Sequence, residues 1–156
     1  MKITFLGHAT LEIQINEYSI LVDPFISGNP SASQINLDDL KPDFILITHA
    51  HQDHTLDVEK LAKDNDSVIV SNFEIVNYFQ NRGFKGHPMN HGGKWNFDFG
   101  ELKYVNAIHT STFPDGSNGG QPGGFIITAN SKSVYVAGDT ALTYDMKLIP
   151  LHYKLD

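Results

Sequence analysis

Cysteine is absent from this sequence of 156 residues. A disulfide framework is therefore excluded, and so is any metal site that needs a thiolate ligand. A metal ion bound by this chain has to be held by histidine, aspartate, glutamate or water. Residues 1–5 enter a predicted strand at once and form no signal-peptide core, and no apolar run is long enough to span a membrane. We therefore expect the protein to be cytoplasmic.

Positive charge is also scarce. Lysine and arginine together number 11, against 18 aspartates and glutamates, which gives a net charge of −7. A nucleic-acid-binding surface is typically basic, so this balance argues against a polymeric nucleic acid as partner. It does not exclude a small phosphate ester, because bound divalent cations dominate the field around them. The length and the hydrophobic content of 40% are typical of one soluble domain, covering residues 1–156.

Strand and helix patterns interleave along the chain. Apolar and polar residues alternate over 11–15, which predicts a half-buried strand with 20–22 as its hairpin partner. The apolar run 44–47 predicts a buried strand, and a helix carrying Val58, Leu61 and Ala62 follows it. A Ser71-x-x-Glu74 capping box predicts the start of another helix. Further strands are predicted at 68–70, 100–109, 124–129 and 133–137. The pattern predicts an α/β (α+β) fold with helices on the outer face of a sheet.

A histidine-rich motif follows the predicted strand 44–47 directly: Thr48-His49-Ala50-His51-Gln52-Asp53-His54. In extended backbone, side chains two positions apart point the same way, so His49 and His51 reach one point with Asp53 near it. His54 turns aside and serves a second point. Two adjacent groups of nitrogen and oxygen donors suit two transition-metal ions. The alternative, a histidine-rich surface loop, is disfavoured by the apolar strand that ends at the motif.

Three more side chains of ligand type follow predicted strands: His8, His109 and Asp139. Taken alone, His109 would more often be structural, and Asp139 between Gly138 and Thr140 would more often be a turn residue. Loops that follow strands are nevertheless where binding residues concentrate, because the sheet holds them in place. We therefore treat His109 and Asp139 as candidate ligands.

Together these residues resemble a known family. The motif His49-x-His51-x-Asp53-His54, with His109 and Asp139, resembles the signature of the metallo-β-lactamase superfamily. Further motifs narrow the resemblance to small bacterial metal-dependent hydrolases related to ascorbate-6-phosphate lactonase: Gly7-His8-Ala9-Thr10, Asp23-Pro24-Phe25-Ile26-Ser27-Gly28-Asn29-Pro30, His87-Pro88-Met89-Asn90, Phe97-Asp98-Phe99-Gly100 and Gly138-Asp139-Thr140-Ala141-Leu142. The resemblance spans residues 2–149. It implies an αβ/βα sandwich, of which this chain supplies one half and part of the other.

The resemblance also implies a dinuclear metal site. The implied ligands are His49, His51 and His109 for the first ion, Asp53 and His54 for the second, and Asp139 bridging both. Zinc fits these ligands best, and manganese or iron are alternatives. A water between the ions would have its pKa lowered from about 15.7 towards 7, and Asp53 could act as catalytic residue by steering it or moving its proton.

Residues outside the ligand set receive weaker assignments. His8 is expected either to contact the substrate or to support a metal ligand, and Asn90 is expected to contact the substrate. Asp23 is expected to be structural or to accept a hydrogen bond from a metal-bound imidazole. Members of the resembled branch are longer, so we expect this chain to be a fragment that lacks the last ligand of the second ion. His152 is a weak candidate for that ligand. A sheet face left bare would favour a homo-oligomer.

Several functions remain open at this point. The first is a dinuclear metal-dependent hydrolase acting on a small-molecule ester, lactone or phosphoester. The second is a nuclease or phosphodiesterase of the same superfamily, and the third is a metal-binding module without turnover. An oxygen-reducing di-iron site would need more carboxylates than this histidine-rich set supplies.

Overall fold

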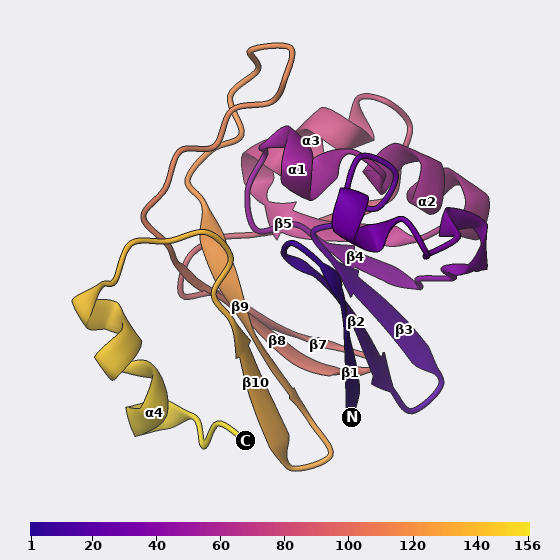
Figure 1. Cartoon of the computed structure of the whole chain (residues 1–156). Helices are drawn as coiled ribbons and strands as arrows, with labels where there is room; N and C mark the ends of the chain where they lie inside the picture. The colour runs from indigo at the N-terminus through magenta and orange to yellow at the C-terminus, as the bar shows by residue number, and fades with distance from the viewer.

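Two β-sheets face each other in the computed structural model, which describes residues 1–156 (Figure 1). The six-stranded sheet has the order β1-β2-β3-β4-β5-β6, and the four-stranded sheet has the order β10-β9-β8-β7. The strands of the first sheet are β1 (Lys2–Gly7), β2 (Thr10–Ile15), β3 (Tyr18–Val22), β4 (Phe44–Leu46), β5 (Val68–Asn72) and β6 (Gly86–Met89). Those of the second are β7 (Lys94–Phe97), β8 (Gly100–Asn106), β9 (Gly123–Ala129) and β10 (Lys132–Val136).

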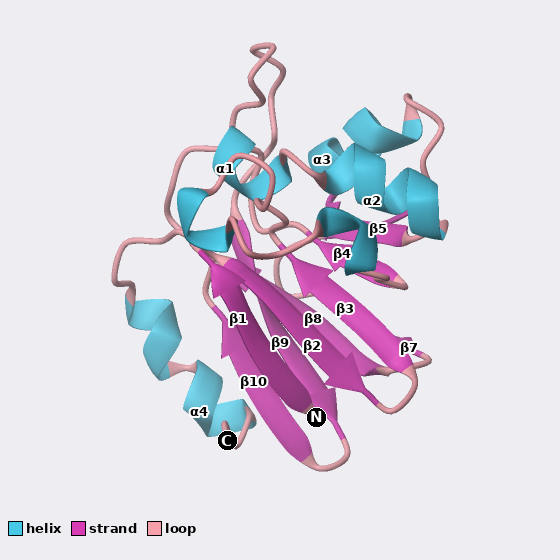
Figure 2. Cartoon of the chain, turned by 45° about the vertical axis from the view of Figure 1, so that its right-hand side comes forward, coloured by secondary structure: helices cyan, strands magenta, loops and turns pink.

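The strand pairing in the first sheet changes from antiparallel to parallel at β3. Strands β1, β2 and β3 pair antiparallel, and the predicted hairpin is confirmed, with Ile13 opposite Ile20. Strands β3 to β6 pair parallel, so each pair needs a crossover connection. A loop with 3₁₀ turns at Pro30–Ala32 and Leu37–Asp39 connects β3 to β4, and α-helices follow β4 and β5. These are α1 (Gln52–Thr55), α2 (Val58–Asn65) and α3 (Phe73–Gln80). Figure 2 shows all three on the same side of the molecule, beside β4 and β5.

Strands β3, β4 and β5 are buried on both faces, which explains their continuous apolar sequences. Val22, Leu46 and Val70 belong to a core shared with the second sheet. Their neighbours Leu21, Ile45 and Ile69 belong to a second core, under α2 and α3. Each fully buried side chain of this kind stabilises the fold by about 1.5–3 kcal/mol. The ends of β4 and β5 are therefore a rigid platform for the loops that follow them.

The start of α3 differs from the sequence prediction. The N-cap is Asn72, whose side-chain oxygen accepts from the N–H of Ile75. Ser71 instead lies within β5, where its hydroxyl donates to the Ile47 carbonyl. The capping box placed at Ser71 is therefore wrong by one position, because strand pairing continues to Asn72 and directs the Ser71 side chain into the sheet.

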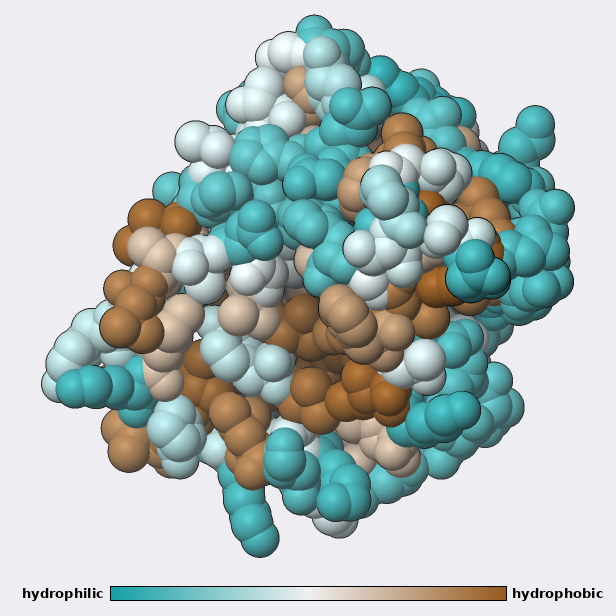
Figure 3. All heavy atoms as spheres, viewed as in Figure 1, coloured by the Kyte–Doolittle hydropathy of each residue, from teal (hydrophilic) through white to brown (hydrophobic).

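The C-terminal segment runs along the outside of the second sheet. It contains a 3₁₀ turn at Tyr144–Lys147 and helix α4 (Ile149–His152), which lies beside β10 (Figures 1 and 2). A cavity of about 330 Å³ separates this segment from β8, β9 and β10. Hydrophobic residues gather on the face shown in Figure 3, and exposed apolar side chains lie on β1 (Ile3 and Phe5) and in the C-terminal segment (Leu142, Leu148 and Leu151). No helix is long and apolar enough to cross a bilayer.

Candidate metal centre

The histidine motif begins as an extended loop and ends as a helix. His49 follows β4, and His51 has extended backbone angles at the N-cap position of α1. Helix α1 begins at Gln52, so Asp53 and His54 lie in a helical turn. The alternation expected from an extended motif therefore stops at His51, and Asp53 is carried away from the point that His49 and His51 share.

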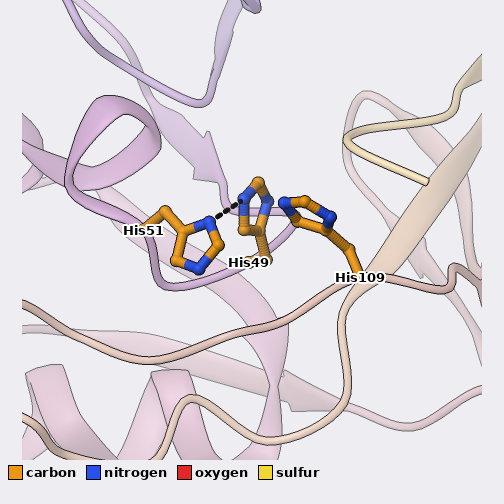
Figure 4. Close-up of side chains that lie close together, drawn as sticks. All are labelled: His49, His51 and His109. Atoms are coloured by element: carbon orange, nitrogen blue, oxygen red, sulfur yellow. Dashed lines mark hydrogen bonds between the residues drawn. The ribbon is translucent and has the colours of Figure 1, made fainter.

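Three histidines converge in the first donor group: His49, His51 and His109 (Figure 4). One ring nitrogen from each lies within 4.8 Å of those of the other two. His49 Nε2 lies 3.0 Å from His51 Nδ1. The centroid of the His109 ring lies 5.0 Å from that of His49 and 5.1 Å from that of His51. The three ring centroids are 4.6–5.1 Å apart and therefore form a compact triangle, whose members Figure 4 shows side by side. His49 is fully buried, whereas His109 is partly open to solvent.

Asp139 connects this group to His54. It follows β10, and its Oδ2 lies 3.7 Å from His54 Nε2 and 3.7 Å from His109 Nε2. His49, His54 and Asp139 form a further donor group within 4.8 Å. The His49 and His54 ring centroids are only 4.0 Å apart. His49 belongs to both donor groups, so the two groups are directly adjacent.

Asp53 joins His54 and His8 in another donor group of the same size. Asp53 Oδ2 lies 3.1 Å from His8 Nε2, and both side chains are about half exposed. His8 has a φ of 52°, a left-handed conformation that is uncommon for residues other than glycine and often found at functional sites. The turn between β1 and β2 thus holds His8 against the motif.

Hydrogen bonds connect the loops that carry the donors. The Thr140 hydroxyl accepts from the Ile108 N–H at 2.9 Å, which ties the Asp139 loop to the His109 loop. The Ser111 hydroxyl accepts from the Ala50 N–H at 3.1 Å, which ties the His109 loop to the histidine motif. Thr110 Oγ1 lies 3.1 Å from His51 Nε2. These hydroxyl groups contact the protein itself and orient the donors.

Close packing also positions Asp139. Gly138 has a φ of 64°, and a Cβ there would lie 2.7 Å from the Thr48 Cβ. Only glycine fits that approach without displacing one of the two loops. Thr48 was not singled out from the sequence as a site residue. Its position directly before the first histidine places it beside the motif but does not indicate its contacts with Gly138 or Asp23.

Comparison with known proteins identifies the family. A family profile described as "Beta-lactamase superfamily domain" matches residues 18–156. A "UPF0173 metal-dependent hydrolase" from Flavobacterium johnsoniae is 64% identical over 156 residues, which are 100% of this chain and 69% of that protein.

The chain belongs to the metal-dependent hydrolases of the β-lactamase superfamily.

Solved structures agree with this assignment. Igni18, a metallo hydrolase from Ignicoccus hospitalis, superposes with a TM-score of 0.84 at 29% identity, over 97% of this chain and 66% of that one. CmlA, a diiron β-hydroxylase from Streptomyces venezuelae, superposes with a TM-score of 0.78 at 21% identity, over 99% of this chain and 33% of that one, and shares the fold. The expected metallo-β-lactamase-like sandwich is thus confirmed.

The donor set of this hydrolase fits a metal ion. His54 Nε2 is buried without a hydrogen-bond partner, an arrangement that is costly unless another group binds the nitrogen. Burial, and then the charge of His54, lowers the pKa of His49 to about 3, so that its imidazole is neutral as a ligand must be. Burial opposes protonation of His54 as well, but the hydrogen bond to Asp23 and the negative charges of Asp23, Asp139 and Asp53 together outweigh burial and raise the pKa of His54.

Asn90 and His152, both named above as candidates, lie outside the donor groups, and so does the neighbouring His91. Asn90 is exposed after β6, and neither the donor groups nor the hydrogen bonds around them include its side chain. His91 stacks on Tyr104 and contacts the Pro122 carbonyl at 2.9 Å. His152 lies in α4 and lines the cavity beside the second sheet, so it joins none of the donor groups.

Proposed function

We propose that this chain carries a dinuclear metal-dependent hydrolase site that acts on a small ester, lactone or phosphoester. The observation that carries the proposal is the position of Asp139 Oδ2, at 3.7 Å from both His54 Nε2 and His109 Nε2. The proposed first site consists of His49, His51 and His109, the proposed second site contains Asp53 and His54, and Asp139 bridges the two. Zinc suits this mixture of imidazole and carboxylate best.

The residues around the proposed ions have distinct roles. When bound, the ions would supply a hydroxide at neutral pH and polarise the substrate oxygen. Asp53 is partly exposed, so its carboxylate is placed to receive a proton and release it to solvent. His8 lies against Asp53 at the open side of the site, which supports its assignment as a substrate contact. Asn90 stays a proposed substrate contact on sequence grounds alone.

A small substrate agrees with the charge of the molecule. The net charge is −7, so the chain offers little attraction for the phosphate backbone of RNA or DNA. A superfamily nuclease would show affinity for RNA that falls steeply with salt. A metal-binding module would hold the ions but release no product. Both alternatives are therefore separable from the proposal by measurement.

The test is a substrate screen of the zinc-loaded chain against lactones, thioesters, phosphomonoesters and phosphodiesters, with Asp139→Ala in parallel. We expect turnover of at least one small-molecule class, which Asp139→Ala abolishes. Asp98→Asn serves as control, because Asp98 is an exposed carboxylate outside the donor groups. Turnover by Asp139→Ala at the wild-type rate would overturn the proposal.

A further inference from the structure

A single buried carboxylate, that of Asp23, contacts His54 directly and reaches His49 through Thr48. Asp23 follows β3, is 1% exposed and has a left-handed φ of 46°. Its Oδ1 accepts from the Thr48 N–H at 2.8 Å. Its Oδ2 lies 2.7 Å from the Thr48 hydroxyl and 3.0 Å from His54 Nδ1. All of these contacts are buried, so water does not compete with them.

The Thr48 hydroxyl passes this orientation on to His49. A carboxylate can only accept, so the one hydroxyl proton of Thr48 is donated to Asp23. The Thr48 oxygen is then left as an acceptor for His49 Nδ1, which lies 3.0 Å away. His49 therefore carries its proton on Nδ1, and its Nε2 presents a lone pair towards His51.

His54 is oriented by the same oxygen without an intermediary. Its Nδ1 donates to Asp23 Oδ2, which leaves Nε2 with a lone pair. That nitrogen is buried, has no hydrogen-bond partner and faces Asp139. In both rings the nitrogen turned towards the donor groups is thus the one without a proton.

We propose that Asp23 is a positioning residue that fixes the ring orientation and the proton position of His49 and His54 together. Its consequence for metal binding rests on the proposed function, whereas the proton positions belong to the metal-free chain. If either ring carried its proton on Nε2, an N–H would point to the place where an ion has to bind. Partners of this kind typically account for about 10–100-fold in metal affinity.

The direct test locates the ring protons by ¹⁵N–¹H correlation spectroscopy on the metal-free chain at mildly alkaline pH. We expect both His49 and His54 to carry the proton on Nδ1. Asp23→Asn replaces one acceptor oxygen by an NH₂ donor, and asparagine tolerates the left-handed backbone at this position. Both oxygens of Asp23 accept hydrogen bonds, so the new NH₂ group faces a group that is also a donor. We expect both rings to relieve this conflict by moving towards the Nε2–H form.

Thr48 variants separate the two branches of the network. Thr48→Val removes the hydroxyl and should change the proton position of His49 while leaving His54 unchanged. Thr48→Ser keeps the hydroxyl and should leave both rings as in the wild type. Unchanged rings in Thr48→Val would overturn the inference even if Asp23→Asn does not fold, because the proton position of His49 would then not depend on the hydroxyl that Asp23 orients.

Zinc titration supplies a second readout. Asp23→Asn should weaken both binding events by about 10–100-fold, and Thr48→Val should weaken only one. An Nε2 proton on either ring of the wild type, or unchanged rings in a folded Asp23→Asn, would overturn the inference. A chain that shows the expected proton positions without hydrolysing any substrate supports the inference and contradicts only the proposed function.

Discussion

Oδ2 of Asp139 lies 3.7 Å from Nε2 of His54. The gap is too long for a hydrogen bond but short enough for one zinc ion to reach both atoms with bonds of about 2.0–2.2 Å. Asp139 follows β10 of the second sheet, whereas His54 lies in α1 beside the first sheet. The proposed site therefore spans the seam between the two sheets, and the packing of the sheets against each other sets its geometry.

Replacing Asp139 should remove the bridge between the two proposed ions. Asp139→Asn keeps the size of the side chain and removes its charge, so we expect fewer zinc ions per chain and a loss of affinity above the roughly 10–100-fold typical of an indirect partner. Elemental analysis of the dialysed protein measures the stoichiometry. Asp98→Asn, the same change at an exposed site, should keep the wild-type zinc content. Equal zinc content in both variants would contradict the bridging role.

The choice among histidines can be tested separately. His51→Ala removes a member of the first donor group and should lower zinc content while leaving the far-UV circular dichroism unchanged. His152→Ala alters a histidine of α4 that lies outside the donor groups, so its zinc content should match the wild type. A loss of zinc from His152→Ala equal to that from His51→Ala would show that the site has been misplaced.

We expect zinc affinity to depend on the close approach of Gly138 to Thr48, which positions Asp139. Gly138→Ala adds backbone strain of about 1–2 kcal/mol and also a Cβ that meets Thr48 at 2.7 Å. Gly116→Ala is the matched control, because Gly116 also has a positive φ of 84° but open space around it. We expect the two variants to lose similar stability from strain, with an additional loss of zinc affinity only for Gly138→Ala. Thermal unfolding and zinc titration measure the two effects.

The pKa of His49 predicts how the metal-free chain responds to acid. Burial, and then the charge of His54, lowers this pKa from 6.5 to about 3 in the folded protein. Between these values the unfolded chain gains a proton that the folded chain does not, so stability should fall as pH decreases through that interval.

Urea unfolding of the wild type and His49→Gln over this pH range isolates the contribution. The variant should show a shallower pH dependence, because glutamine does not titrate. Identical slopes would contradict the assignment. His54 has a raised pKa, so its contribution has the opposite sign: it is present below 6.5 and is lost as pH rises through the folded value.

Much of the fold was predictable because the strongest sequence signals coincide with the cores. The alternation over 11–15 and the apolar run 44–47 correspond to β2 and β4. Both strands place fully buried side chains in the cores, Ile13 and Ile15 from β2 and Ile45 and Leu46 from β4. Strands β6 and β7 were not predicted. Gly86–Met89 contains a proline, and Lys94–Phe97 is only four residues long and mostly exposed, so both are edge strands formed by pairing rather than by an intrinsic pattern.

The sequence motifs predict which side chains converge but not how they group. Periodicity placed Asp53 beside His49 and His51, whereas α1 begins at Gln52 and turns Asp53 towards His8. A single helical turn leaves no periodic signal, so the sequence could not predict it. The role of Thr48 was also out of reach, because it depends on contacts with Asp23 and Gly138 that only the folded chain creates.

Anomalous diffraction from crystals of the zinc-loaded 156-residue chain would locate the proposed ions themselves. We expect one zinc peak among His49, His51 and His109, and a second peak next to His54 and Asp53, with Asp139 in contact with both. Zinc peaks distant from Asp139 and His109 would contradict the proposed dinuclear site.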